Sequence, residues 1–219
     1  MADPDDDAVA LARRVADELG STLQAGPCCS PQATRLRHQI VNLLRCDACQ
    51  DMSFRVNSIH ITGSTFRAVA SALEGPRHRL HIRIDPQLKK FNGKFERDTL
   101  VFNFDELGAK ESDIASHCET VVHECTHAGV ALAGRRVYRT DNEVAGWFAG
   151  VLFLRGQGLA IEGEMDARKN LRALADDARK ANVRGRVFDL PPAAVAALSR
   201  DIVAAYGISP RMVDEALSP

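Results

Sequence analysis

No stretch of the sequence approaches the roughly 18 consecutive apolar residues that a membrane-spanning helix requires. The chain also lacks an excess of charge of either sign, since 28 basic residues stand against 29 acidic ones and the formal net charge is -1. A surface that binds nucleic acid needs an excess of basic side chains. We therefore expect neither a membrane nor a nucleic acid as a partner.

A basic leader is missing as well, because the chain begins with the acidic stretch MADPDDDAV. A secretory signal peptide begins with basic residues ahead of an apolar segment. The expected location is therefore the cytoplasm, or a destination reached by export without a cleavable signal peptide. The sequence also lacks internal repeats, low-complexity tracts and long linkers. With 219 residues, 45% of them hydrophobic, the chain is long enough to form one large domain with a hydrophobic core.

Hydrophobic periodicity predicts helices at both ends of the chain and strands between them. The predicted helices span residues 5–24, 31–46, 64–75, 113–133, 143–158, 162–181 and 192–206, with a short one after Pro210. The predicted strands span residues 53–62, 77–85 and 98–104, and the turn signal Asn92-Gly93 suggests that the last two pair antiparallel. The expected N-caps are Ser30, Ser112 and either Asp141 or Asn142, and Ser64 is expected near the cap of its helix. This order indicates an α+β fold with a small, mostly antiparallel sheet.

The informative motif is His123-Glu124-Cys125-Thr126-His127, which lies inside a predicted helix. Residues four apart share one helical face, so two imidazoles can hold one Zn²⁺. Glu124 lies one step round the helix, where it can point at the water that such a metal activates. We therefore expect His123 and His127 as zinc ligands and Glu124 as the catalytic general base.

A catalytic zinc needs a third protein ligand. No histidine follows His127 in the chain, so a third histidine downstream is excluded. The next predicted helix begins at Asp141-Asn142-Glu143. If the two helices pack antiparallel, a glutamate in the first turn of the second faces the histidines of the first. Glu143 is therefore the expected third ligand, and Asp141 is the fallback.

These residues resemble the gluzincin branch of the zincin metallopeptidases, in which a second helix supplies a glutamate, often as Asn-Glu. Here that pair reads Asn142-Glu143. The segments DTLVFNF, VVHECTHA and NEVAGWFAG are similar to compact bacterial members, and the resemblance covers about residues 78–158. It implies a zincin-like fold, Zn²⁺ as cofactor and hydrolysis of peptide bonds in a peptide or protein substrate. It also implies that the strand before the signature helix, or its neighbour, lines the cleft.

Two positions depart from the thermolysin-like members of that branch. Four residues after the ligand glutamate those members carry an aspartate that supports a zinc histidine, and here the position is Trp147. They also stabilise the oxyanion with a later histidine, which this chain lacks. Tyr138 is the expected substitute, since it lies between the two helices among Arg135, Arg136 and Arg139. The cleft is expected to be lined by residues 98–104 and 135–141.

Two other interpretations stay open beside that of a metallopeptidase. A chain with this motif and no signal peptide can be a secreted effector or toxin protease. Alternatively, the two departures suit a non-catalytic zincin-like regulatory module that binds a protein. A regulatory or cognate inhibitor protein is then an expected class of partner.

The cysteines divide between two regions of the chain. Cys46-x-x-Cys49 has metal or redox spacing, but the adjacent pair Cys28-Cys29 is a poor second half of a metal site, so structural zinc, disulfides and free thiols all stay open. These four lie in residues 1–52, which we expect to form a helical pair, an appendage or lid on a zincin-like unit of residues 53–219. Small buried thiols are expected further along, at Cys118 and Cys125, and His117 is expected to be a surface or packed histidine and not a ligand.

Overall fold

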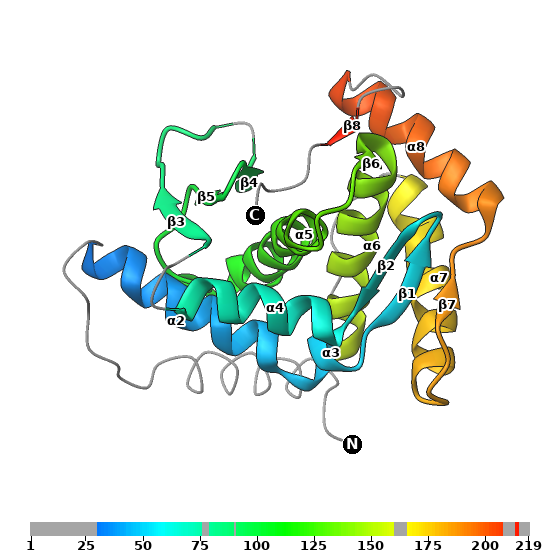
Figure 1. Cartoon of the computed structure of the whole chain (residues 1–219), viewed down its shortest axis with the longest axis horizontal. Helices are drawn as coiled ribbons and strands as arrows, with labels where there is room; N and C mark the ends of the chain where they lie inside the picture. The colour runs from blue at the N-terminus through cyan, green and yellow to red at the C-terminus, as the bar shows by residue number, and fades with distance from the viewer. Residues whose placement is uncertain (1–29, 76–78, 90, 160–165, 208–212, 215–219) are drawn as a thin grey trace.

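The computed structural model describes residues 30–75, 79–89, 91–159, 166–207 and 213–214 (Figure 1). The helix expected over residues 5–24 lies outside this part of the chain, as do Cys28 and Cys29. Of the helices within it, none combines the length and the apolar character that a membrane span requires.

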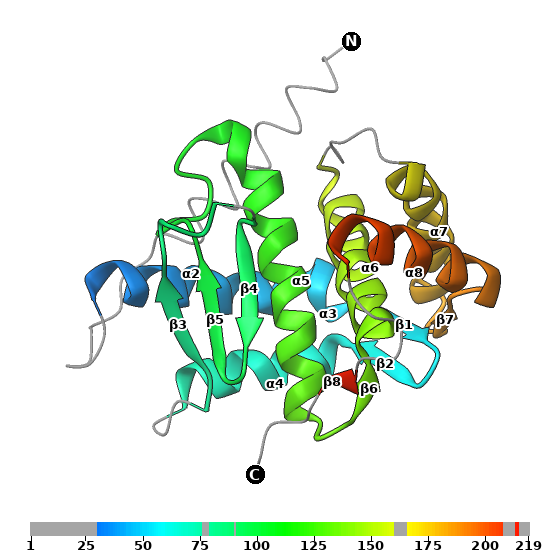
Figure 2. The ribbon, with the colours of Figure 1, turned by 90° about the horizontal axis from the view of Figure 1, so that it is seen from above.

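The fold is α+β, and the helix α5 (Ile114–Leu132) runs through its middle (Figures 1 and 2). The strand β4 (Gly93–Glu96) packs along one side of α5, and the helix α6 (Arg139–Gln157) packs along the other. The helix α4 (Gly63–Glu74) crosses beneath α5. The predicted signature helix is therefore surrounded by both kinds of secondary structure.

The first sheet has the order β3-β5-β4, where β3 is His81–Ile84 and β5 is Thr99–Phe102. β5 pairs antiparallel with β4 but parallel with β3, so the expected antiparallel pairing of the last two predicted strands is wrong. The reason is that an additional strand, β4, lies between β3 and β5 in the sequence. The chain therefore reverses twice between β3 and β5, and the two strands run in the same direction. The tight reversal lies at Arg97, which has a left-handed φ of 58°, whereas Gly93 of the expected turn is buried within β4.

The second sheet also mixes directions. β1 (Ser53–Val56) pairs antiparallel with β2 (Ile59–Thr62) and parallel with β7 (Phe188–Asp189). A two-stranded ribbon joins β6 (Val137–Tyr138) to β8 (Val213–Asp214). The described residues beyond Pro210 are thus a strand and not the short helix expected there. In place of the one small sheet that was expected, the described residues form two mixed three-stranded sheets, each with one parallel pair, and the two-stranded ribbon.

Between Ser30 and Gly207 the described long helices lie where periodicity placed them, but several begin at other residues. In α2 (Pro31–Arg45) the Ser30 hydroxyl accepts a hydrogen bond from the Ala33 N–H at 3.2 Å, which confirms the predicted cap. The N-caps of the next long helices are Thr62 for α4, Asp113 for α5 and Tyr138 for α6. Ser64 lies near the cap of α4, as expected, whereas the caps expected at Ser112 and at Asp141 or Asn142 are wrong. The last of these errors arises because β6 leads directly into α6.

One hydrophobic core joins the N-terminal and C-terminal helices to the middle of the chain. Leu36 and Ile40 of α2 are fully buried in it, and α2 packs against α4. At the other end, α7 (Asp166–Asn182) and α8 (Pro192–Tyr206) pack on α6, while the four-residue α3 (Asp47–Gln50) contacts α4 and α6. The described part of residues 1–52, which was expected to be an appendage or lid, thus shares a hydrophobic core with residues 53–219.

Candidate metal centre

α5 and α6 form a helical hairpin in which residues 133–138 reverse the chain. Gly134, with a φ of 68°, follows the last turn of α5 in the left-handed conformation that glycine adopts without strain. The two helices pack closely along their length. One face of α5, with residues spaced three or four apart, borders a cavity through Ser116, Glu119, Thr120, His123, Glu124 and His127.

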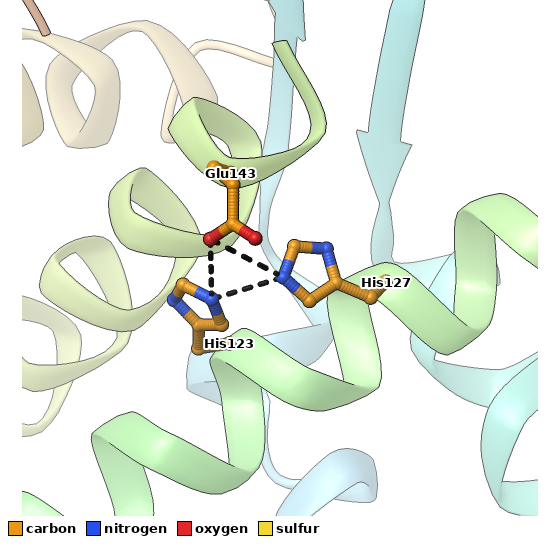
Figure 3. A group of neighbouring side chains, drawn as sticks. All are labelled: His123, His127 and Glu143. Carbon is orange, nitrogen blue, oxygen red and sulfur yellow. Dashed lines mark hydrogen bonds and ion pairs between the residues drawn. The ribbon is translucent and has the colours of Figure 1, made fainter. Parts of the chain in front are cut away.

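Three side chains from this hairpin point toward one another (Figure 3). The Nε2 atoms of His123 and His127 are 2.9 Å apart, and Oε2 of Glu143 lies 3.4 Å from the first and 3.8 Å from the second. Ligands bound at about 2.1 Å around a tetrahedral ion lie about 3.4 Å from one another. The three separations therefore bracket what a single tetrahedral Zn²⁺ needs.

The three groups also tune one another electrostatically. Burial alone would raise the pKa of Glu143, but the hydrogen bond from His123 and the charges of His127 and Arg139 lower it to about 2. Burial lowers the pKa of His123, whereas nearby glutamates, Glu143 foremost, outweigh it and raise that pKa. A carboxylate that stays ionised beside two imidazoles is a donor set that favours a cation.

The side chains around the centre hold one histidine more closely than the other. Trp147 meets His123 edge to face, with ring centroids 5.4 Å apart. A Cβ atom on Gly146 would stand 3.0 Å from Cε1 and Nε2 of His123, so any larger residue would require the ring to shift by a few tenths of an ångström. The buried Nδ1 of His127 has no hydrogen-bond partner within the described part of the chain.

A cavity of about 600 Å³ adjoins these side chains. Besides α5 and α6 it is lined by residues 91–96, which include all of β4. Of the two expected possibilities, the neighbour of the strand 98–104 lines the cavity and that strand does not, because β4 lies between β5 and α5. From the expected loop 135–141, Arg139 is the residue that lines the cavity. The sequence carried a signal for β4, since Gly93-Lys94-Phe95-Glu96 alternates small or apolar with charged residues ahead of a tight reversal.

Of the other predicted site residues, Glu124 lines the cavity, whereas Tyr138 and Asp141 lie apart from the three converging side chains. Glu124 is 8% exposed and lines the cavity beside the histidines. Tyr138 is 57% exposed, and the lining formed by the described residues does not include it. Asp141 is buried but does not join the three converging side chains. Glu143, and not the fallback Asp141, is therefore the acidic residue that the structure brings to the histidines.

The residues predicted to be uninvolved are also accounted for. His117 stacks on Phe104 with ring centroids 3.9 Å apart, away from the centre, which confirms a packed histidine. Cys118 and Cys125 are buried free thiols, as expected. Trp147 and Arg139 also line the cavity, although neither was expected among the site residues. Their spacing from Glu143, four residues on either side along one helix, was the signal that could have found them.

No protein-family model matches the chain, and no match is found among curated proteins or among solved structures. The geometry of the metal centre therefore carries the functional conclusion.

Proposed function

We propose that this chain is a zinc-dependent metallopeptidase of gluzincin character, with His123, His127 and Glu143 as ligands. One observation carries the proposal: the potential ligand atoms of these three side chains all lie within 4.8 Å of one another. Two imidazole nitrogens and one carboxylate oxygen make up the donor set of many catalytic zinc sites. The adjoining cavity gives a substrate access to them.

The residues of the chain divide the chemistry between them. Zinc held there would polarise the scissile carbonyl and lower the pKa of a water molecule to about 7. Glu124 then acts as the general base that takes the proton of the attacking water and later passes it to the leaving amine. Arg139, which lines the same cavity, supplies a permanent positive charge for the oxygen of the tetrahedral intermediate. Arg139 replaces Tyr138 in this role because the tyrosine does not line the cavity.

The position of β4 supports an extended peptide as substrate. β4 is an edge strand of its sheet and also lines the cavity. An edge strand offers backbone N–H and C=O groups with which an extended peptide can pair. A peptide paired in this way would lie directly beside the histidines of α5.

The proposal is tested with the purified full-length chain and its Glu124→Gln variant. Zinc content is measured by elemental analysis, and cleavage is followed on a denatured protein and a broad peptide library. The wild type is expected to hold one zinc and to cleave. Glu124→Gln is expected to hold zinc equally well but to lose at least about 10²-fold in rate, because a general base contributes on that order. Glu74→Gln, the same substitution at an exposed ion pair with Arg45, is the matched control.

An undiminished cleavage rate in Glu124→Gln contradicts the proposed mechanism. One zinc bound without any cleavage by the wild type favours the second candidate, a non-catalytic zincin-like module. The specific observations that favour this candidate are the tryptophan at position 147 and the unpartnered Nδ1 of His127 among the described residues, since catalytic zinc histidines are usually held by an acceptor.

A further inference from the structure

A second reactive group lies at the opposite end of α6 from Glu143. Cys46 and Cys49 occupy a single turn, in which the Cys49 N–H donates to the Cys46 carbonyl at 3.0 Å. Both are free thiols. They differ in access, because Cys46 is partly exposed whereas Cys49 is completely buried.

The two thiols are in contact, and the contact favours one of them as a thiolate. The Cys49 side chain and the backbone N–H groups of Cys49 and Ala48 lie close enough to the Cys46 sulfur to favour its thiolate through hydrogen bonding. Nε2 of Gln157, the last residue of α6, lies 3.5 Å from the same sulfur and donates to it as well. The thiol of Cys49 is the largest of these causes, and together they outweigh burial and lower the pKa of Cys46 to about 7. Burial raises the pKa of Cys49 well above its usual range.

The remaining described cysteines provide the contrast. Burial raises the pKa of Cys118 to about 12, and Cys118 and Cys125 are at most 1% exposed. Thiols of that kind do not attack a disulfide that arrives from solvent, because the attacking thiolate must be accessible to it. Within the described part of the chain, a metal-ligating group of three or more side chains forms at the histidines and not at these cysteines. The turn at Cys46 thus holds a dithiol with one accessible and one shielded sulfur.

We propose that Cys46 and Cys49 form a dithiol site that exchanges with disulfides, independently of the metal centre. The Cys46 thiolate attacks one sulfur of a substrate disulfide, RSSR, forms a Cys46–SR mixed disulfide and expels RS⁻, which takes up a proton. Cys49 then loses its proton and attacks the Cys46 sulfur, forming the Cys46–Cys49 disulfide and expelling the second thiolate. The balance is two protein thiols and one RSSR for one protein disulfide and two RSH. The substrate class is an accessible disulfide bond.

Oxidised glutathione serves as the probe, with the full-length chain. After incubation, the protein is denatured, free thiols are alkylated, and tryptic peptides are weighed. The chain suits this readout, because cleavage at Arg45 and Arg55 releases a peptide of residues 46–55 that holds both cysteines of the site and no others. Cys28 and Cys29 fall in residues 15–35, and the two buried thiols fall in residues 111–135.

In the wild type, residues 46–55 are expected to lose two hydrogens and to escape alkylation, with two glutathione molecules released per chain. Cys49→Ser, which keeps a hydrogen-bond donor but cannot resolve the intermediate, should accumulate one glutathionyl group on Cys46. Cys49→Ala is the second variant should a buried serine prevent folding. Cys46→Ser should take up no glutathione on residues 46–55. Residues 111–135 should remain fully alkylated throughout.

Alkylation of native Cys46 followed against pH gives an independent readout, with an expected midpoint near 7. Full alkylation of residues 46–55 after the incubation overturns the proposal, as does the absence of a glutathionyl adduct in both Cys49 variants. A cross-link from residues 46–55 to either of the other two cysteine peptides overturns it too. So does protection of native Cys46 from alkylation that a zinc chelator relieves, since this assigns the cysteines to a structural metal site.

Discussion

His117 shows how a position on a helix separates a packed histidine from a ligand. It shares α5 with His123 and His127 but lies six residues before the first of them, on a different face. Its ring stacks on Phe104, with an angle of 13° between the two planes. Burial lowers its pKa below the usual 6.5, against smaller opposing effects of Asp113 and the Glu106 backbone. The protonation of this side chain is therefore linked to folding.

We expect His117 to make the folded state less stable as the pH falls below 6.5. The unfolded chain binds a proton near 6.5 and the folded chain only at lower pH, so the penalty is absent well above 6.5 and complete below the folded pKa. His117→Gln lacks this penalty. The measurement is the free energy of unfolding by urea between pH 7.5 and 5, in which the wild type should lose stability relative to the variant. Parallel curves would disprove the linkage, and His117→Phe, which keeps a stacking ring, is the control for lost packing.

At the scale of elements, the α5–α6 hairpin shapes the metal centre through small residues of α6. A side chain at Gly146 would reach His123, and one at Gly150 would stand 2.8 Å from Cγ of Glu119. The close approach of the two helices therefore depends on glycine at positions four residues apart. Glycine in a helix costs about 1 kcal/mol relative to alanine, which the packing here offsets.

Gly146→Ala is expected to displace the His123 ring and to weaken zinc binding by roughly 10-fold or more, the usual range for a residue that orients a ligand. Competition with a chelator measures the affinity. Gly156→Ala is the matched control on the same helix, because its Cβ would stand 3.1 Å from the Ala48 methyl group, away from the centre. Equal zinc affinity in the two variants would show that Gly146 does not set the position of the ring.

The sequence predicts those features that depend on local spacing. The two histidines share a helical face because they are four residues apart, and Glu143 meets them because a short connection forces the helices into a hairpin. The parallel pairing of β3 with β5 escaped prediction because it depends on an intervening strand and on a reversal at Arg97, which no glycine marks. The lining of the cavity escaped it for the same reason, since strand order is a non-local property.

The proposed metal centre is connected to the core of the whole molecule through α6. Phe148, fully buried on this helix, packs edge to face against Phe54 of β1 at 4.9 Å and stacks on Phe188 of β7 at 6.1 Å. The helix that carries Glu143 therefore also holds the second sheet. A metal ion bound by residues of both α5 and α6 would stabilise the packing of these two helices, and the second sheet packs on α6.

Zinc is accordingly expected to stabilise the whole fold by mass action. At free zinc of 100 times the dissociation constant, the free energy of unfolding should rise by about 2.7 kcal/mol. Thermal unfolding in zinc buffers measures the effect, which should be absent in the double variant His123→Ala, His127→Ala. His60→Ala, which alters an exposed histidine on β2, should respond like the wild type. Equal stabilisation of all three proteins would place zinc elsewhere.

The most direct test of the central claim is anomalous X-ray diffraction at the zinc absorption edge from crystals of the zinc-loaded protein. We expect one strong peak at about 2.1 Å from Nε2 of His123, Nε2 of His127 and a carboxylate oxygen of Glu143, with Glu124 close to the remaining coordination position. A zinc peak bound by Asp141 in place of Glu143, or one located only among the cysteines, would contradict it.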